Sequence, residues 1–432
     1  MLLRPLGLFA LVLLSTSISA QGPDLVGYWH NWNDASAPYI ELDQVDPRYT
    51  VIEVSFAEPA PGTTYNMQFS PAQTAPAIFI AQVASLQAQG KKVLISIGGA
   101  NATVQLNADV ERDQFVSSVL GILNAYGFDG IDIDLEGASV GNSGGTIAAP
   151  TTPSIIRLID AVEAIMVQYR AQHNRKLFLT MAPETAYVQG GMSAYGGIWG
   201  AYLPIIDALR DSLDILQVQL YNSGSMYGLD GGIYTQGTAD FIVSQTEAVI
   251  QGFTTAGGTF AGLRADQVAI GLPACVSAAG GGYVDTATVR AAADHLLGAG
   301  PQPGTYVLQQ SGGYPDLRGL MTWSVNWDAA PSCNGANSFA ETYERIFGSM
   351  ATTITDQGAT HLLPLYPNPA RDRITMRLPS GCSSMRVVIQ DLTGRIVTDT
   401  WSMGLVDVSH LSNGFHVLTC PALGFRANFI KE

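Results

Sequence analysis

The sequence predicts an α/β fold, a TIM (β/α)8 barrel, followed by a small all-β sandwich domain. Eight short apolar segments rich in β-forming residues alternate with longer amphipathic stretches between residues 24 and 345. Strands separated by helix-length segments favour a parallel barrel over an open doubly wound sheet. After residue 350 the alternation gives way to short strands and turns, which predicts a second domain. The expected barrel strands are 26–29, 51–56, 92–97, 131–134, 177–182, 215–221, 267–272 and 319–324.

Helices are expected between several of these strands, at residues 77–89, 112–126 and 154–173. Gly90 and Gly127 stand where the residue that ends a helix is expected, because glycine adopts the left-handed conformation at little steric cost. In barrels of this kind the reactive groups lie at the C-terminal ends of the strands. Candidate functional residues are therefore expected at strand ends.

The C-terminal region, residues 361–432, differs from the rest of the chain in composition. It carries seven Lys and Arg against five Asp and Glu, whereas the remaining chain carries 14 against 31. Its β-rich segments at 374–378, 385–390 and 415–418 are broken by Asn, Gly and Pro turns, which predicts a small β-sandwich. We expect the barrel at 24–348, a linker at 349–360 and the sandwich at 361–432.

The first 20 residues have the features of a secretory signal peptide. Arg4 gives a basic start, an apolar run follows at 8–14, and residues 15–20 are mostly small or polar. This run is too short to span a bilayer, and no later segment reaches about 18 consecutive apolar residues, so no membrane span is expected. Export permits disulfides, and the simplest pairing joins Cys275 to Cys333 and Cys382 to Cys420.

The charge of the chain excludes one class of partner. The formal net charge is -15, and a strongly acidic chain repels phosphate backbones, so no nucleic-acid partner is expected. A neutral polymer remains compatible with this charge. The cysteines form no CxxC pair, and no His is placed so as to suggest zinc, so no zinc site is expected.

The segment 128–136, which reads FDGIDIDLE, holds acidic residues at alternating positions, namely Asp132, Asp134 and Glu136. Side chains two apart in a strand share a face, so these carboxyl groups point into the barrel at intervals of about 6–7 Å. Ionising all of these neighbouring carboxyl groups costs free energy, because their negative charges repel. A proton is therefore held among them, and the pKa of the outermost group is raised. Such a group suits general-acid cleavage of a glycosidic bond. A Ca²⁺ or Mg²⁺ site is the alternative, but no second acidic cluster completes its oxygen shell.

This segment resembles the DxxDxDxE signature of glycoside hydrolase family 18, which Asp129, Asp132, Asp134 and Glu136 match. The SxGG signature of the family's third strand resembles residues 96–99, Ser-Ile-Gly-Gly. The resemblance spans roughly residues 24–345. It implies that Glu136 is the catalytic acid and base, that Asp134 orients the acetamido group of the substrate, and that Asp132 shares a proton with Asp134. It implies no metal and no organic cofactor.

Three further strand ends are similar to the same family, namely residues 181–184, which read MAPE, residues 219–222 and residues 321–324. By resemblance, Tyr221 hydrogen-bonds the acetamido oxygen and Trp323 forms the floor under the sugar, where the apolar face of a pyranose ring stacks on an indole. Residues 219–222, which read QLYN, resemble a bacterial and fungal chitinase branch, whereas many members carry Met and Asp at the positions of Gln219 and Asn222. The candidate substrate-binding residues are Trp323, Met181, Glu184, Gln219, Asn222, Tyr28 and Phe56. Tyr195, Trp199 and Tyr202 are candidate outer sugar platforms.

The resemblance implies a chitinase, which hydrolyses β-1,4-linked N-acetylglucosamine polymers with retention by substrate assistance. The partners it implies are chitin or N-acetylglucosamine oligomers. Two alternatives stay open. One is an endo-β-N-acetylglucosaminidase on N-glycan cores, which uses the same acidic strand. The other is a chitin-binding lectin on the same barrel, although such proteins typically lose the residue that is present here as Glu136.

Three segments of the C-terminal region resemble the sorting domain of type IX secretion cargo in Bacteroidota. They are residues 365–370, LYPNPA, residues 391–395, DLTGR, and residues 411–415, LSNGF. The resemblance implies export through the periplasm by the type IX secretion machinery, to the medium or to the cell surface. A carbohydrate-binding β-sandwich is the alternative, because that scaffold hosts unrelated functions.

Overall fold

The computed structural model of the chain describes residues 22–348, 365–376, 385–391, 395–420 and 425–432. These residues belong to two compact units that divide between Thr342 and Tyr343, and each unit is described by itself. The expected signal peptide at 1–20 and the expected linker at 349–360 lie outside the described residues. Within the described ranges, no helix combines the length and the apolar character that a membrane span requires.

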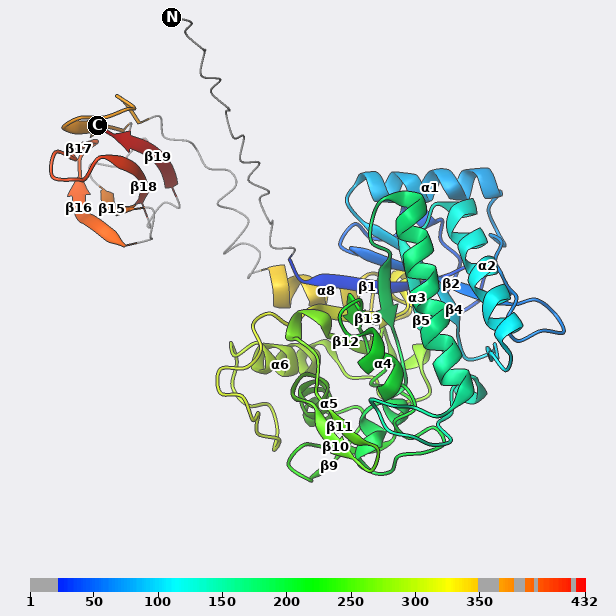
Figure 1. Cartoon of the computed structure of the whole chain (residues 1–432). Helices are drawn as coiled ribbons and strands as arrows, with labels where there is room; N and C mark the ends of the chain where they lie inside the picture. The colour runs from blue at the N-terminus through cyan, green and yellow to red at the C-terminus, as the bar shows by residue number, and fades with distance from the viewer. Residues whose placement is uncertain (1–21, 349–364, 377–384, 392–394, 421–424) are drawn as a thin grey trace, which may run out of the picture. The chain divides into compact units, whose positions relative to one another are not determined.

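The first unit is built on a barrel of parallel strands (Figure 1). The strands pair in the order β12-β13-β1-β2-β4-β5-β6-β7. Isolated parallel bridges from Leu216 to Val268 and from Gln219 to Gly271 then join β7 to the β12 side and close the barrel. The predicted fold class is confirmed. The strands are β1 Asp24–His30, β2 Val51–Pro59, β4 Lys92–Gly98, β5 Gly130–Asp134, β6 Phe178–Met181, β7 Ile215–Leu216, β12 Ala269–Pro273 and β13 Gly319–Trp323.

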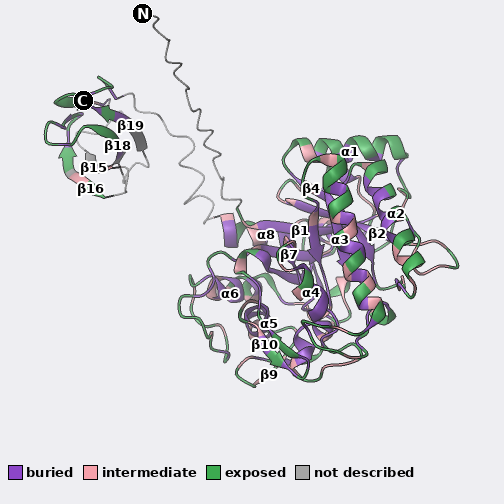
Figure 2. Ribbon diagram, viewed as in Figure 1, coloured by how far each residue is buried: buried purple, intermediate pink, exposed green. Residues whose placement is uncertain are grey.

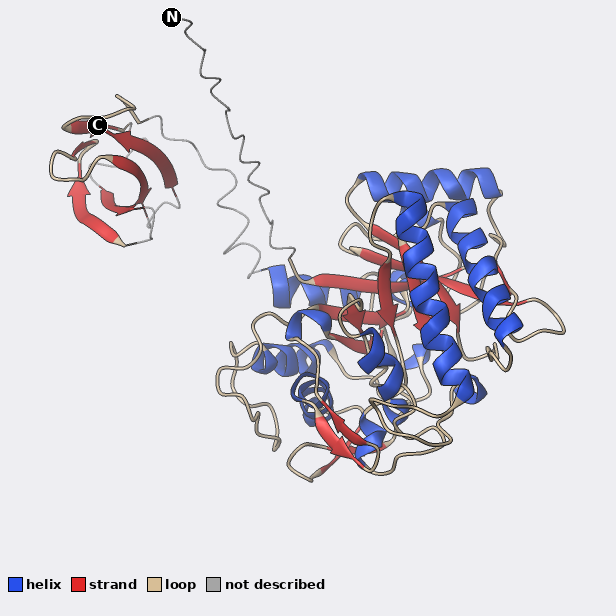
Figure 3. Cartoon of the chain, in the orientation of Figure 1, coloured by secondary structure: helices blue, strands red, loops and turns tan. Residues whose placement is uncertain are grey.

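Helices cover the outside of the barrel (Figure 3), and their outward faces are exposed while the strands are buried (Figure 2). Pro76 and Pro153 stand at the starts of α1 and α3, where the missing N–H leaves no hydrogen bond unmade. Gly127, with φ of 73°, ends α2 as expected. The helices are α1 Pro76–Ala88, α2 Asp109–Tyr126, α3 Pro153–His173, α4 Leu203–Leu209, α5 Ala239–Gln251, α6 Thr286–Leu296, α7 Val325–Ala329 and α8 Ser338–Tyr343.

Short strands extend the loops of the barrel. One hairpin pairs β8 Ser225–Tyr227 with β9 Ile233–Thr235, and another pairs β10 Phe253–Thr255 with β11 Gly258–Phe260. The two-residue strand β3, Met67–Gln68, pairs with the end of β2. The β3 and β8–β9 additions belong to the loops that follow β2 and β7, where the functional site of such a barrel lies, whereas β10–β11 lies between α5 and β12.

The sequence predicts the sixth barrel strand at 215–221, but the regular strand β7 covers only Ile215–Leu216. The N–H groups of Gln217 and Gln219 still donate to the carbonyl groups of Met181 and Pro183, each at 2.9 Å. Pro183 has no N–H to donate in return, so the ladder is one-sided beyond Leu216. The segment 217–221 therefore remains extended beside β6 without forming a regular strand.

The second unit is a two-layer β structure, as the sequence predicts. One antiparallel sheet pairs β14 Arg373–Thr375 with β17 Leu405–Asp407. The other has the order β16-β15-β18-β19, formed by β16 Ile396–Ser402, β15 Met385–Asp391, β18 Gly414–Cys420 and β19 Phe425–Lys431. Apolar side chains from both sheets share one buried core, which includes Ile374, Ile389, Val406, Leu418 and Phe429.

A disulfide joins Cys275 to Cys333, with the two Cα atoms 5.4 Å apart. Cys275 follows β12 and Cys333 follows α7, so the bond ties together segments that follow the neighbouring strands β12 and β13. Both cysteines are buried, together with Ala274 and Ala330. The other expected pair, Cys382 and Cys420, lies outside the described side chains.

Candidate active site

A row of carboxyl groups rises along β5 and beyond its end, from the barrel interior to an open cavity. Asp132 is 0% exposed, Asp134 is 2% exposed, and Glu136 is half-buried. The alternation of acidic and apolar residues places all three on the inner face, and Ile131, Ile133 and Leu135 are buried on the other face. The row therefore runs from a dry interior toward solvent.

Three hydroxyl groups hold the innermost acid, Asp132. The hydroxyls of Tyr28 and Ser96 each donate to its Oδ2 at 2.7 Å, and the Thr180 hydroxyl lies 2.7 Å from its Oδ1. These side chains come from β1, β4 and β6 respectively. Burial raises the pKa of the Asp132 carboxyl, and the three hydrogen bonds act in the opposite direction because they favour its ionised form.

The two glycines that follow Ser96 bring β4 close to the acidic row. Gly98 and Gly99 have φ angles of 109° and 81°, in the left-handed region that favours glycine. A Cβ atom on Gly99 would lie 2.7 Å from the ring of Phe56, and the Gly99 N–H donates to the Asp134 carbonyl at 2.7 Å. The Ser-Ile-Gly-Gly segment thus supplies a hydroxyl to Asp132 and a backbone donor beside Asp134.

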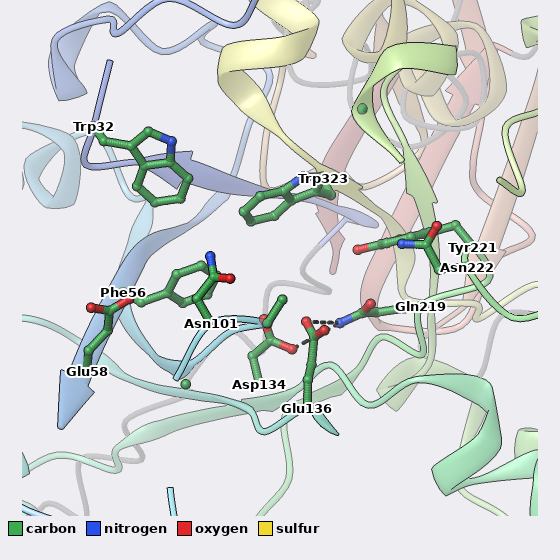
Figure 4. A pocket seen from close by; sticks show the side chains of 13 residues that line it. Trp32, Phe56, Glu58, Asn101, Asp134, Glu136, Gln219, Tyr221, Asn222 and Trp323 are labelled. Carbon is green, nitrogen blue, oxygen red and sulfur yellow. Dashed lines mark hydrogen bonds between the residues drawn. The ribbon is translucent and has the colours of Figure 1, made fainter. Parts of the chain in front are cut away.

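The outer pair of acids shares one donor. The Gln219 amide nitrogen lies 3.0 Å from Oδ1 of Asp134 and 3.1 Å from Oε1 of Glu136 (Figure 4). Burial raises the pKa of Asp134 well above its ordinary value, and the neighbouring charges of Glu136, Asp132 and Glu53 raise it further. Burial also raises the pKa of Glu136, against the hydrogen bonds from Gln219 and Asp134. Loss of the last proton from this pair is therefore opposed.

A fourth carboxyl group, which the sequence analysis missed, lies at the base of the row. Glu53 of β2 is 0% exposed and lies 2.8 Å from the Thr180 hydroxyl through Oε1. The Gln217 amide nitrogen donates to both of its carboxyl oxygens, at 2.6 and 2.7 Å. A single acid within the apolar strand VIEVSF was the available signal, because an unpaired charge is rarely buried without a specific environment.

The acidic row forms one wall of a cavity of about 520 Å³. Figure 4 shows the indole of Trp323 across the cavity from Asp134 and Glu136, with Trp32 and Phe56 at one end and Tyr221 at the other. The rings of Phe56 and Trp323 are 5.9 Å apart and nearly parallel, with an interplanar angle of 13°. Flat apolar surfaces opposite carboxyl groups suit a sugar ring, whose faces are apolar and whose edges carry hydroxyls.

Most of the predicted site residues lie together in this cavity. Its lining includes Asp134, Glu136, Gln219, Tyr221, Asn222, Trp323 and Phe56. Tyr28 is buried below it, at 1% exposure, and supports Asp132 there. Met181 is also buried but does not line the cavity, because Thr180 beside it points into the barrel and Met181 shares the outer face with its partner Ile133. Glu184 is half-buried outside the lining, and burial together with the nearby charge of Glu136 raises the pKa of its carboxyl. The lining residues that the sequence analysis missed include Trp32, Glu58 and Asn101.

The expectation that Tyr202 is an outer sugar platform is wrong. Tyr202 is 0% exposed, and its hydroxyl lies 2.8 Å from the backbone nitrogen and 3.0 Å from the carbonyl oxygen of Leu135. It therefore holds the backbone between Asp134 and Glu136. Trp199, by contrast, is 36% exposed.

Asp129, the first acid of the DxxDxDxE segment, lies away from the cavity. It precedes β5 at the opposite end of the barrel, where it pairs with Arg175 at 2.5 Å and accepts hydrogen bonds from the Val93 backbone and the Gln87 side chain. Its contacts are structural, since they tie β4, α1 and the segment after α3 to the start of β5. Within the described ranges, no group of three or more His, Cys, Asp or Glu is arranged to hold a metal ion.

The C-terminal unit has a clear counterpart. Residues 364–422 match the family described as "Secretion system C-terminal sorting domain". A domain of this kind indicates a secreted or cell-surface protein.

Comparison with known proteins places the barrel equally clearly. Chitinase Chi52 of Paenibacillus xylanexedens is 46% identical over 355 residues, and Chitinase D of Niallia circulans is 46% identical over 356 residues. Each alignment covers 80% of this chain, which spans 66% of the length of either relative. A solved family GH18 chitinase from Chromobacterium violaceum is 41% identical with a TM-score of 0.66, and the match covers 76% of this chain and 83% of that one. Residues 24–308 match the family described as "Glycosyl hydrolases family 18". With the acidic row of β5 and the barrel that carries it, this match establishes that the chain belongs to glycoside hydrolase family 18.

Proposed function

We propose that the protein is a chitinase that hydrolyses β-1,4-linked N-acetylglucosamine polymers with retention of the β configuration. One observation carries the proposal: Glu136 is the outermost, half-buried acid of a coupled row, and it faces a cavity with an aromatic wall. Its carboxyl has a raised pKa and is hydrogen-bonded to Asp134 and Gln219. A carboxyl group with a raised pKa keeps its proton to higher pH than an ordinary one and can release it to a leaving oxygen.

The position of the second acid favours a nucleophile from the substrate. In retaining enzymes that use their own nucleophile, two carboxyl groups flank the scissile bond at about 5–5.5 Å. Asp134 instead lies two residues before Glu136 on the same face and is hydrogen-bonded to it. It therefore cannot attack from the opposite side of the sugar. The acetamido oxygen of the substrate is placed to do so, and family 18 is an exception of this kind.

Each residue of the cavity then has a role. Glu136 protonates the leaving oxygen and later takes a proton from the incoming water. Asp134 and Tyr221 hold the acetamido group and stabilise the oxazolinium ion that forms from it, while Trp323 supports the sugar ring. Asp132, at the buried base, accepts or releases a proton as Asp134 changes its charge.

The names of the relatives support chitin as the substrate class. The experiment that tests the proposal compares the purified protein on chitin oligomers and on a high-mannose glycoprotein. A chitinase should release short N-acetylglucosamine oligomers and leave the glycoprotein intact. Glu136→Gln is the control, because the amide keeps the shape and cannot donate the proton. Release of intact N-glycans, with chitin oligomers untouched, would identify an endo-β-N-acetylglucosaminidase. Tight binding without cleavage would identify a lectin.

We also propose that residues 361–432 direct the enzyme through the periplasm to the type IX secretion machinery. The match of residues 364–422 to a sorting domain supports this route. Chitin is insoluble and cannot enter a cell, so its hydrolysis requires an exported enzyme. The proposed substrate and the proposed route are therefore consistent.

A further inference from the structure

The hydroxyl group of Thr180 lies between two buried carboxyl groups. Its oxygen is 2.8 Å from Oε1 of Glu53 and 2.7 Å from Oδ1 of Asp132, both within hydrogen-bond distance. A hydroxyl group has a single hydrogen and can donate to only one of the two oxygens. The second contact is a hydrogen bond only if the other carboxyl group carries a proton and donates it to Thr180. The geometry therefore requires one proton on Glu53 or Asp132.

The remaining partners decide where this proton rests. Oδ2 of Asp132 accepts hydrogen bonds from the hydroxyls of Tyr28 and Ser96, so with Thr180 this carboxyl has three donors, the environment that favours an ionised carboxylate. Apart from Thr180, the hydrogen bonds that favour the ionised form come from Gln217 and Tyr28 at Glu53, and from Ser96, Tyr28 and Gln217 at Asp132. The consistent arrangement has Glu53 donating to the Thr180 oxygen and Thr180 donating to Asp132.

The surroundings of Glu53 agree with a protonated acid. Glu53 is 0% exposed and forms no ion pair within the described residues. The titratable groups that face it are Tyr28 of β1, Asp132 and Asp134 of β5, and Tyr221, while the strands β4, β6 and β7 bring the neutral groups Ser96, Thr180 and Gln217. Burial raises the pKa of Glu53 well above its ordinary value, and the charge of Asp132 raises it further.

We propose that Glu53 is a positioning residue that stores a proton at the base of the acidic row and exchanges it with Asp132 through the Thr180 hydroxyl. In the exchange the Glu53 proton moves to the Thr180 oxygen, and the Thr180 hydrogen moves to Asp132. The negative charge passes from Asp132 to Glu53, and the number of protons is conserved. No other group is needed for this step.

The exchange would assist the proposed reaction, on which this part of the inference rests. Asp134 must become charged to stabilise the oxazolinium ion, and an ionised Asp132 opposes that charge. Asp132 acts on Asp134 more strongly than Glu53 does, so moving the charge to Glu53 lowers the opposition. Asp134 can then ionise beside a neutral Asp132. Glu53 thus acts through Asp132 and Asp134 and does not touch the substrate.

The first test needs no substrate. Infrared difference spectra of the full-length wild type minus Glu53→Gln should show the carbonyl band of a protonated carboxylic acid, and this band should shift in D₂O. Its absence would mean that Glu53 is ionised and would overturn the inference. Because this measurement does not depend on hydrolysis, it separates the stored proton from the proposed function. A wild type that fails to cleave chitin oligomers would overturn the proposed function instead.

The second test is the pH profile of kcat on a soluble chitin oligomer. In Glu53→Gln the charge stays on Asp132, so Asp134 should ionise less readily and the acidic limb should move to higher pH by about half a unit. Thr180→Val breaks the relay and should give a similar shift of the acidic limb. Thr180→Ser keeps the hydroxyl and should have the wild-type limb. The double variant Glu53→Gln with Thr180→Val should shift the limb no further than either single variant.

Glu247→Gln is the matched control, because Glu247 is also 0% exposed and hydrogen-bonded, to Tyr306 and Tyr314, away from the cavity. An unshifted acidic limb in Glu53→Gln, or an equal shift in Glu247→Gln, would contradict the relay.

Discussion

The amide nitrogen of Gln219 lies 3.1 Å from Oε1 of Glu136, and this hydrogen bond opposes the rise in pKa that burial gives to the acid. The same nitrogen lies 3.0 Å from Asp134, so one side chain holds both outer acids of the row. A residue of the segment that follows β7 thus tunes the proposed proton donor just beyond the end of β5.

Gln219→Met should shift the alkaline limb of the pH profile. The hydrogen bond favours the ionised form of Glu136, so its loss should raise the pKa of Glu136. A general acid must be protonated, and kcat/KM on a chitin oligomer should therefore persist to higher pH, by about one unit. Gln251→Met on the exposed side of α5 is the matched control. A limb that stays in place or moves to lower pH would contradict this assignment.

Asp134→Asn should lower kcat strongly and change the acidic limb. The amide cannot take the negative charge that stabilises the oxazolinium ion, and we expect a loss of about 100-fold, as for removal of one group that stabilises transition-state charge. The limb that reports ionisation of Asp134 should disappear from the plot of kcat against pH. A kcat within about tenfold of wild type, with the same profile, would show that the coupling has no role in the reaction.

Trp323→Ala should weaken substrate binding without moving the pH profile. The indole lines the cavity opposite the acids, and loss of a stacked aromatic surface costs about 0.5–1.5 kcal/mol, which corresponds to roughly a 2- to 13-fold loss of kcat/KM. Trp401→Ala is the matched control, because Trp401 is 71% exposed and belongs to the C-terminal unit. Equal kinetics for Trp323→Ala and wild type would remove Trp323 from the proposed site.

A chain that ends at Gly348 should fold and hydrolyse soluble oligomers at a rate within about twofold of the full chain, because the barrel and the cavity residues all precede that point. In the native host the same truncation should leave the enzyme in the periplasm, as fractionation and immunoblotting would show. Loss of activity on soluble oligomers would make the C-terminal unit structural. Normal export with weaker binding to solid chitin would make it a carbohydrate-binding domain.

The acidic row and the barrel could be predicted from the sequence because both follow from local periodicity. Alternating residues of one strand share a face, so Asp132, Asp134 and Glu136 come together whatever the rest of the chain does. Glu53 could not be placed in the same way, since its contact with Asp132 depends on how β2, β5 and β6 close around one interior. Tyr202 looked like a loop residue, and only the folded structure shows that its hydroxyl, from the residue before α4, lies on the Leu135 backbone. Contacts between strands distant in sequence carry no local signal.

The configuration of the first product tests the central claim most directly. If the acetamido oxygen of the substrate is the nucleophile and Glu136 is the acid and base, two inversions at the anomeric carbon give net retention. Proton NMR of a chitin oligomer, recorded within the first minutes of hydrolysis by the full-length protein, should therefore show the new reducing end as the β anomer, which converts to the α anomer only later. Fresh α anomer in the earliest spectra would mean single displacement by water and would contradict the account.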